Sequence, residues 1–94
     1  MKKLANVHPG EVLQEEFLVE LGMSQNALAR AIKVPPRRIN EIVHGMRSIS
    51  ADTALRLSIA LGTTPQFWLG LQADYDLEEA ARVDLSSVER LVAV

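Results

Sequence analysis

Four polar residues in the middle of the chain could bond to another molecule, because of their types and their spacing. At the i, i+3, i+4 and i+7 positions of one stretch stand Arg37, Asn40, Glu41 and His44. On a helix, this spacing places the other three side chains within roughly 60 degrees of Arg37. Such side chains can donate to or accept from base edges in the major groove of DNA. The stripe therefore indicates a helix surface able to read a DNA sequence.

The same stretch has an apolar side that can anchor it. Ile39, Ile42 and Val43 fall opposite the polar stripe, and Arg38 lies on the flank. Apolar residues on one side of a helix normally face the protein core. We therefore expect this helix to be held by its apolar side while its polar stripe faces outward.

A tight turn and another helix are predicted to precede the stripe. Ser24 can cap the earlier helix, and Leu28, Ala31 and Ile32 are expected to face inward. Pro36 can begin the following helix, because the first helical N–H has no partner within the helix. The pattern is therefore helix, turn, helix.

The flanking segments also have helical periodicity. Pro9 can open a first helix that ends at Gly22, and Leu13, Phe17 and Leu21 repeat every four residues, as a core-facing stripe does. Two more helices are predicted after the polar stripe, over residues 51–61 and from residue 65 onward, each preceded by a capping Ser or Thr.

The C-terminal part is expected to supply a dimer surface. Ser86 and Glu89 form a capping-box pattern, which predicts a short last helix near residues 88–92. A helix this short is unstable alone, so it must pack on something. The bulky apolar residues assigned to dimerisation are Trp68, Leu71, Leu91 and Val92.

The predicted fold class is all-α, with five helices in a helix-turn-helix arrangement and a short C-terminal helix. Ninety-four residues are expected to make a single domain, residues 1–94. Its helix-turn-helix core is predicted at about 23–48, and residues 64–94 are assigned to dimerisation.

Charge is distributed unevenly along the chain. The formal net charge is −2, but the segment 24–50 holds five cations and one anion. The segments before and after it, 1–23 and 51–94, carry net charges of −2 and −4. A basic middle within an acidic chain is a local electrostatic footprint for a polyanion, which the global charge hides.

The sequence gives little indication of a metal site, a catalytic site or a membrane segment. The chain has no cysteine and two histidines far apart in sequence, so no metal site or cofactor is expected. It lacks a glycine-rich phosphate loop and a nucleophile elbow, so we do not expect an enzyme. No apolar run could span a bilayer, and the start lacks the apolar middle of a signal peptide, which favours a cytoplasmic protein.

Several stretches of the sequence resemble a known protein family. The stretch SQNALARAIKVPPRRINEIVHGMRSIS, followed by ALRLSIALGTTP, resembles the Xre or phage-repressor type of helix-turn-helix domain. The flanking segments HPGEVLQEEFL and TPQFWLGLQADYDLEEA resemble HigA antitoxins, also called virulence-associated protein I. The resemblance implies a homodimer that binds palindromic double-stranded DNA in its own promoter. It also implies that the protein neutralises a HigB toxin, a RelE-like endoribonuclease.

By position, the resemblance implies seven DNA-binding residues: Gln25, Arg37, Arg38, Asn40, Glu41, His44 and Arg47. The first matches a phosphate contact that sometimes reaches a base, the next four occupy the base-reading stretch, and the last two lie near backbone contacts. Pro36 replaces a polar residue that phage repressors often use, so one usual base contact is missing. Glu41 would either accept from a cytosine amino group or hold Arg37 or Arg38 in place.

Two alternatives remain open from the sequence. The first is an autonomous Xre-type regulator without a toxin partner. The second is a protein-interaction module that has lost DNA binding and uses the Trp68 helix as its contact face. A toxin gene beside this one would separate the antitoxin from the autonomous regulator, and charge reversal at Arg37 and Arg38 would leave only the interaction module intact.

Overall fold

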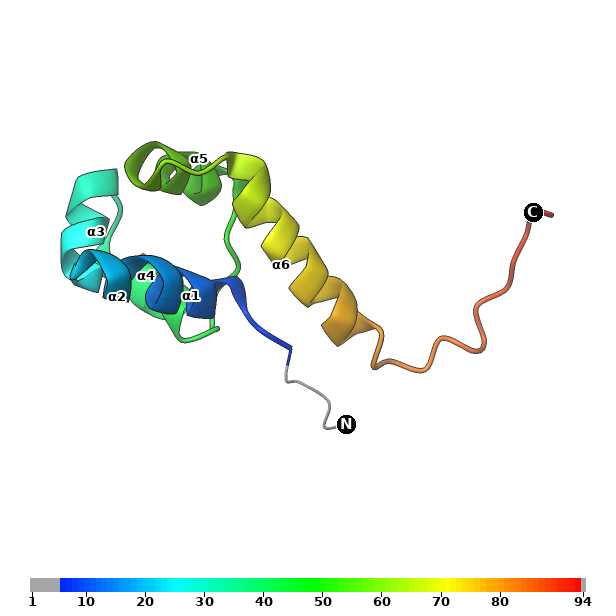
Figure 1. Ribbon diagram of the computed structural model, residues 1–94. Helices are drawn as coiled ribbons and strands as arrows, with labels where there is room; N and C mark the ends of the chain where they lie inside the picture. Colours follow the sequence, from blue (N-terminus) through cyan, green and yellow to red (C-terminus); the bar gives the residue numbers. More distant parts are fainter. Residues whose placement is uncertain (1–5, 94) are drawn as a thin grey trace.

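The computed structural model describes residues 6–93, and within them the chain forms helices and no strand (Figure 1). Three segments follow one another without a break as the first helix, so the predicted five-helix class is confirmed. The segments are α1 (Pro9–Val12), η1 (Leu13–Leu18), α2 (Val19–Leu21), α3 (Gln25–Ile32), α4 (Pro36–Val43), α5 (Ala51–Leu61) and α6 (Pro65–Ala80). Residues 1–5 and 94 of the predicted domain lie outside the described part.

The middle of the first helix, η1, is a π-helix rather than an α-helix. The N–H of Val19, the residue directly after η1, donates to the carbonyl of Gln14, five residues earlier. The wider turn brings residues five apart onto one face, so Leu13 and Leu18 are both buried, at 0% and 1% exposure. Leu21 is 58% exposed, so its predicted place in the core is wrong. The four-residue spacing assumed an uninterrupted α-helix.

The turn between α3 and α4 is built as the sequence predicts. The Ser24 side chain accepts from the Ala27 N–H at 3.0 Å and so caps α3. Lys33 ends α3 in the left-handed conformation, with φ 64°, which turns the chain sharply. Val34 is buried between the helices, and Pro36 begins α4.

Helix α3 faces the core with a slightly different set of residues from the predicted one. Leu28 and Ile32 are buried as expected, together with Ala29. Ala31 is exposed, so its predicted inward position is wrong. The buried side is centred between positions 28, 29 and 32, which leaves position 31 on its edge.

Helix α6 closes the core with an aromatic cluster. Trp68 is fully buried, its Nε1 donates to the Thr63 hydroxyl at 2.7 Å, and its ring lies 5.2 Å from that of Phe17. The expectation that Trp68 offers surface to a partner is therefore wrong, because its ring fills the core of its own chain. Leu71 is half-buried and also packs against this core.

The chain after α6 contains no helix between residues 81 and 93, so the predicted short C-terminal helix is absent. This segment extends away from the helices (Figure 1). The Asp84 carboxylate accepts from the Ser86 N–H at 3.0 Å, which closes a local turn in place of a helix cap. Leu91 and Val92 are 91% and 70% exposed, so no part of the chain between residues 6 and 93 packs against a helix there.

The start of the first helix fits tightly against the end of α4. A Cβ added at Gly10 would collide with the carbonyl oxygen of Ile42, so only glycine allows the two backbones to approach this closely. His8 caps the same helix, because its Nδ1 accepts from the Gly10 N–H at 2.9 Å. The His8 ring also meets Tyr75 of α6 edge to face, with ring centroids 4.8 Å apart. The N-terminus of α1 thus joins α4 and α6.

Substituting Gly10 by alanine should destabilise the protein. Because the collision would be with backbone, the helices must move apart, and we expect a loss of about 1–3 kcal/mol or more in the free energy of unfolding. Gly70→Ala is the matched control, since a Cβ there meets nothing within 4 Å. In the middle of α6 it should stabilise by about 0.5–1 kcal/mol. Urea denaturation measures both, and equal effects would contradict the close contact.

Stability should also fall in mild acid because of His8. Burial lowers the pKa of His8, and the charges of Asp76 and Glu11 oppose this in part. The unfolded chain therefore takes up the proton more readily, and stability is lost as pH falls below about 6.5, the ordinary histidine value, toward the lowered value. His8→Asn keeps an acceptor for the Gly10 N–H without titrating, so this part of the pH dependence should disappear. Urea denaturation at pH 7.5 and 5 tests this; identical pH slopes for the two proteins would show that His8 is not responsible.

Candidate nucleic-acid interface

Helix α4 separates an apolar side from a polar one. Ile39 and Ile42 are both fully buried, whereas the Arg37 side chain is 85% exposed. Since the two isoleucines fix the rotation of the helix, the residues on its other side face outward. The structure thus gives α4 the two-sided character that its sequence indicates.

The N-terminus of α3 lies beside this outward side. The Asn40 side-chain amide donates to Oε1 of Gln25 at 3.3 Å, which joins the two helices of the turn. One turn further along, His44 Nδ1 donates to the backbone carbonyl of Asn40 at 2.8 Å, since a carbonyl can only accept. Three of the seven predicted residues therefore form one connected group.

A second group is centred on a carboxylate. Glu41 accepts from Nε of Arg37 through Oε2 and from Nε of Arg47 through Oε1, both at 2.9 Å. The hydrogen bond from Arg47, followed by that from Arg37, lowers the pKa of Glu41 below its usual value. Glu41 is therefore ionised at neutral pH, and the group as a whole carries one positive charge.

Arg38 stands apart from both groups. Its Nη1 contacts the Asp52 carboxylate at 3.2 Å, and its side chain is 29% exposed. Asp52, in the first turn of α5, also pairs with Arg56 at 3.1 Å. The sequence placed Arg38 on the flank of the stripe, but it did not reveal this partner, which lies 14 residues further along the chain.

A buried glutamine fixes the loop that follows α4. Gln72 of α6 accepts from the Ile49 N–H at 2.8 Å and donates to Asp76 at 3.0 Å. The loop contains Arg47, so α6 helps to place that cation. Gln72 was not predicted as a functional residue, because the sequence shows only an amide side chain directly after Leu71.

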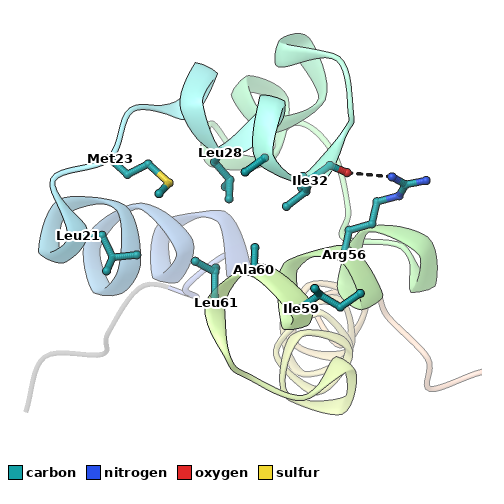
Figure 2. A pocket seen from close by; sticks show the side chains of 9 residues that line it. Leu21, Met23, Leu28, Ile32, Arg56, Ile59, Ala60 and Leu61 are labelled. Atoms are coloured by element: carbon teal, nitrogen blue, oxygen red, sulfur yellow. Dashed lines mark hydrogen bonds between the residues drawn. The ribbon is translucent and has the colours of Figure 1, made fainter.

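One apolar hollow opens on the surface, and its lining residues form no catalytic constellation (Figure 2). It has a volume of about 400 Å³ and lies between α3, α5 and the end of the first helix. Its polar group, Arg56, donates to the Ile32 carbonyl at 2.8 Å and so satisfies the end of α3. Among residues 6–93, no three histidine or acidic side chains gather as a metal ion would require. Nor is any helix in this range long and apolar enough to cross a membrane.

These features are those of a helix-turn-helix protein, and comparison with known families agrees. The helix-turn-helix family model HTH_3 matches residues 14–68, more than half of the chain. The chain therefore belongs to the helix-turn-helix family.

Individual proteins similar to this chain show which members of the family it resembles. Virulence-associated protein I of Dichelobacter nodosus is 49% identical over 92% of this chain and 79% of its own length. The structure of the Pseudomonas aeruginosa antitoxin HigA with the higBA promoter superposes with a TM-score of 0.88, at 42% identity, covering 94% of this chain and 100% of that one. Antitoxin GraA in complex with its operator gives a TM-score of 0.87 at 47% identity, covering 99% and 98%.

The similarity to HigA antitoxins and virulence-associated protein I, predicted from the sequence, is thus confirmed. The relatives are antitoxins and transcriptional regulators, which supports the prediction that this chain is not an enzyme.

Proposed function

We propose that the protein is a dimeric transcriptional repressor that binds a palindromic operator in its own promoter, with α4 in the major groove. The observation that carries this proposal is the outward side of α4, where Arg37 and Asn40 face away from a buried apolar anchor. Arg47, from the loop that follows α4, is joined to Arg37 through Glu41. Two similar proteins have been solved on promoter or operator DNA, as described above. One helix of this kind reads only a few base pairs, so two copies about 34 Å apart are needed.

The residue roles differ within the proposed interface. Arg37 and Asn40 would read base edges, Gln25 would contact a phosphate from the start of α3, and Arg47 would contact the backbone. His44 would support Asn40 and lie near the backbone. Arg38, which Asp52 holds, would act from the edge of the surface.

Alanine at Arg37 or Asn40 should weaken operator binding by about 1–3 kcal/mol per half-site and relax base preference, because each removes a base contact. Arg47→Ala should weaken binding to all sequences alike and reduce the salt slope by about one unit per half-site. Titration against the upstream region and a scrambled duplex of equal length, at two salt concentrations, measures both effects.

Arg82→Ala is the charge-matched control, since Arg82 follows α6 and pairs with Glu79. It should leave operator selectivity unchanged. Unaltered operator affinity for both Arg37→Ala and Asn40→Ala would refute the assignment of α4. Equal, salt-sensitive binding of wild-type protein to both duplexes would favour the interaction module instead.

We further propose an antitoxin role, in which the protein neutralises a RelE-like endoribonuclease of the HigB kind. The support is similarity to proteins named as HigA antitoxins. The competing hypothesis is an autonomous regulator, which has the same DNA-binding surface. Coexpression with the protein encoded next to it distinguishes the two, because an antitoxin should restore growth and copurify with a toxic neighbour.

We assign dimerisation to the outer side of α6 and the segment after it. The apolar residues exposed there include Leu77, Leu91 and Val92, at 69%, 91% and 70% exposure. Large apolar surfaces of this kind are typical of contact sites.

The free protein should therefore be a dimer at micromolar concentration, and replacing Leu91 and Val92 together by aspartate should weaken it by roughly tenfold or more. Ile59→Asp is the control, because Ile59 is 85% exposed on α5. Sedimentation velocity measures all three proteins. A monomeric wild-type protein, or equal weakening by the control, would contradict the assignment.

A further inference from the structure

We propose that Glu41 is a positioning residue that determines how selectively α4 reads DNA, by holding Arg37 and Arg47 in one fixed arrangement. This inference rests on the proposed function, since it concerns how the same surface discriminates between sequences. It assigns to Glu41 a role other than contacting a base.

The geometry supports a bridge rather than a single ion pair. Both carboxylate oxygens of Glu41 are used, one for each arginine, at 2.9 Å in each case. The Glu41 side chain is only 21% exposed, compared with 85% for Arg37 and 48% for Arg47. The carboxylate thus lies beneath two more exposed cations.

The backbone brings the second arginine into reach. Two residues after the end of α4, Gly45 turns the chain with φ 73°, and the Met46 N–H donates to the Glu41 carbonyl at 2.8 Å. The Gly45 N–H donates to the Ile42 carbonyl at 3.0 Å, which completes a Schellman motif. This turn brings Arg47 back toward the end of α4. Arg47 there donates to the side chain of Glu41, the same residue whose backbone carbonyl accepts from Met46.

The bridge leaves the arginines able to bind DNA. Each guanidinium has five N–H donors, and the bond to Glu41 uses the one on Nε. The terminal nitrogens, which form bidentate bonds with guanine or phosphate, remain available. Glu41 therefore orients both cations without occupying the donors that recognition needs.

Fixing the arginines should favour the operator over other DNA. Phosphates occur along every sequence, so a freely moving arginine can neutralise one anywhere, which raises non-specific affinity. An arginine held in advance loses less conformational freedom when it meets the correct base, and it reaches misplaced phosphates less well. The negative charge of Glu41 also reduces the attraction of the surface for any polyanion. Selectivity increases through both effects.

Glu41→Gln is the first test. Glutamine has one side-chain oxygen, so it can hold at most one of the two arginines, and it removes one negative charge. Affinity for scrambled DNA should rise, its salt dependence should steepen by about one unit per half-site, and the operator-to-scrambled ratio should fall by roughly fivefold or more. Fluorescence anisotropy with both duplexes at several salt concentrations gives all three quantities.

Two further variants separate positioning from charge. Glu20→Gln, on α2, makes the same charge change on an exposed side chain and should leave the ratio unchanged. Glu41→Asp keeps the charge, but its shorter side chain cannot span both arginines. It should therefore lower the ratio without steepening the salt dependence.

The outcomes are distinct. If the wild-type protein does not prefer its operator, the proposed function fails. If it does prefer the operator but Glu41→Gln keeps the wild-type ratio, the role of Glu41 is overturned while the proposed function stands. If Glu41→Asp behaves as wild type while Glu41→Gln and Glu20→Gln both lose selectivity, charge alone is responsible and positioning is refuted.

Discussion

The burial of Ile39 and Ile42 is the constraint on which the rest of this structure depends. Both side chains are removed completely from solvent, so α4 cannot rotate about its axis without exposing them. The same rotation sets where Arg37, Asn40 and Glu41 point. Gly10 reinforces it, because the first helix meets the Ile42 carbonyl so closely that no side chain fits between them. The geometry of the proposed interface is thus fixed from the apolar side.

Ion pairs explain how an acidic chain can present a basic surface in an ordered form. Glu41 holds two arginines of this surface, and Asp52 holds a third, Arg38, against α5. Pairs this exposed contribute little to stability. Their effect is on geometry, since each restricts where a long cationic side chain can reach. In the proposed function, the acidic residues near α4 therefore contribute to recognition by orienting the cations rather than by binding.

Helix α6 contributes to the core, and we propose a second role for it in dimerisation; its sequence does not separate the two. Toward the core it provides Trp68, which fills the space against Phe17, and Gln72, which holds the loop after α4. Its outer side and the segment beyond it leave Leu77 and Leu91 exposed. The proposed dimer surface therefore consists of the exposed residues and does not include Trp68. The size of Trp68 suggested a contact with another protein, but its ring is buried within its own chain.

The sequence by itself determined the five helices, the caps at Ser24, Ser50 and Thr64, and the polar stripe of α4, because these follow from residues three or four apart and from single capping residues. The capping-box pattern at Ser86 predicted a further helix that does not form, because nothing described in the structure packs against it. It also identified Glu41 as a residue that could hold an arginine on its own helix. Only the tertiary structure decided which side of η1 is buried, where Arg38 finds its partner and which way Trp68 faces. The physical reason is distance along the chain. Contacts between residues far apart in sequence depend on how the helices pack together, and no local spacing encodes that packing.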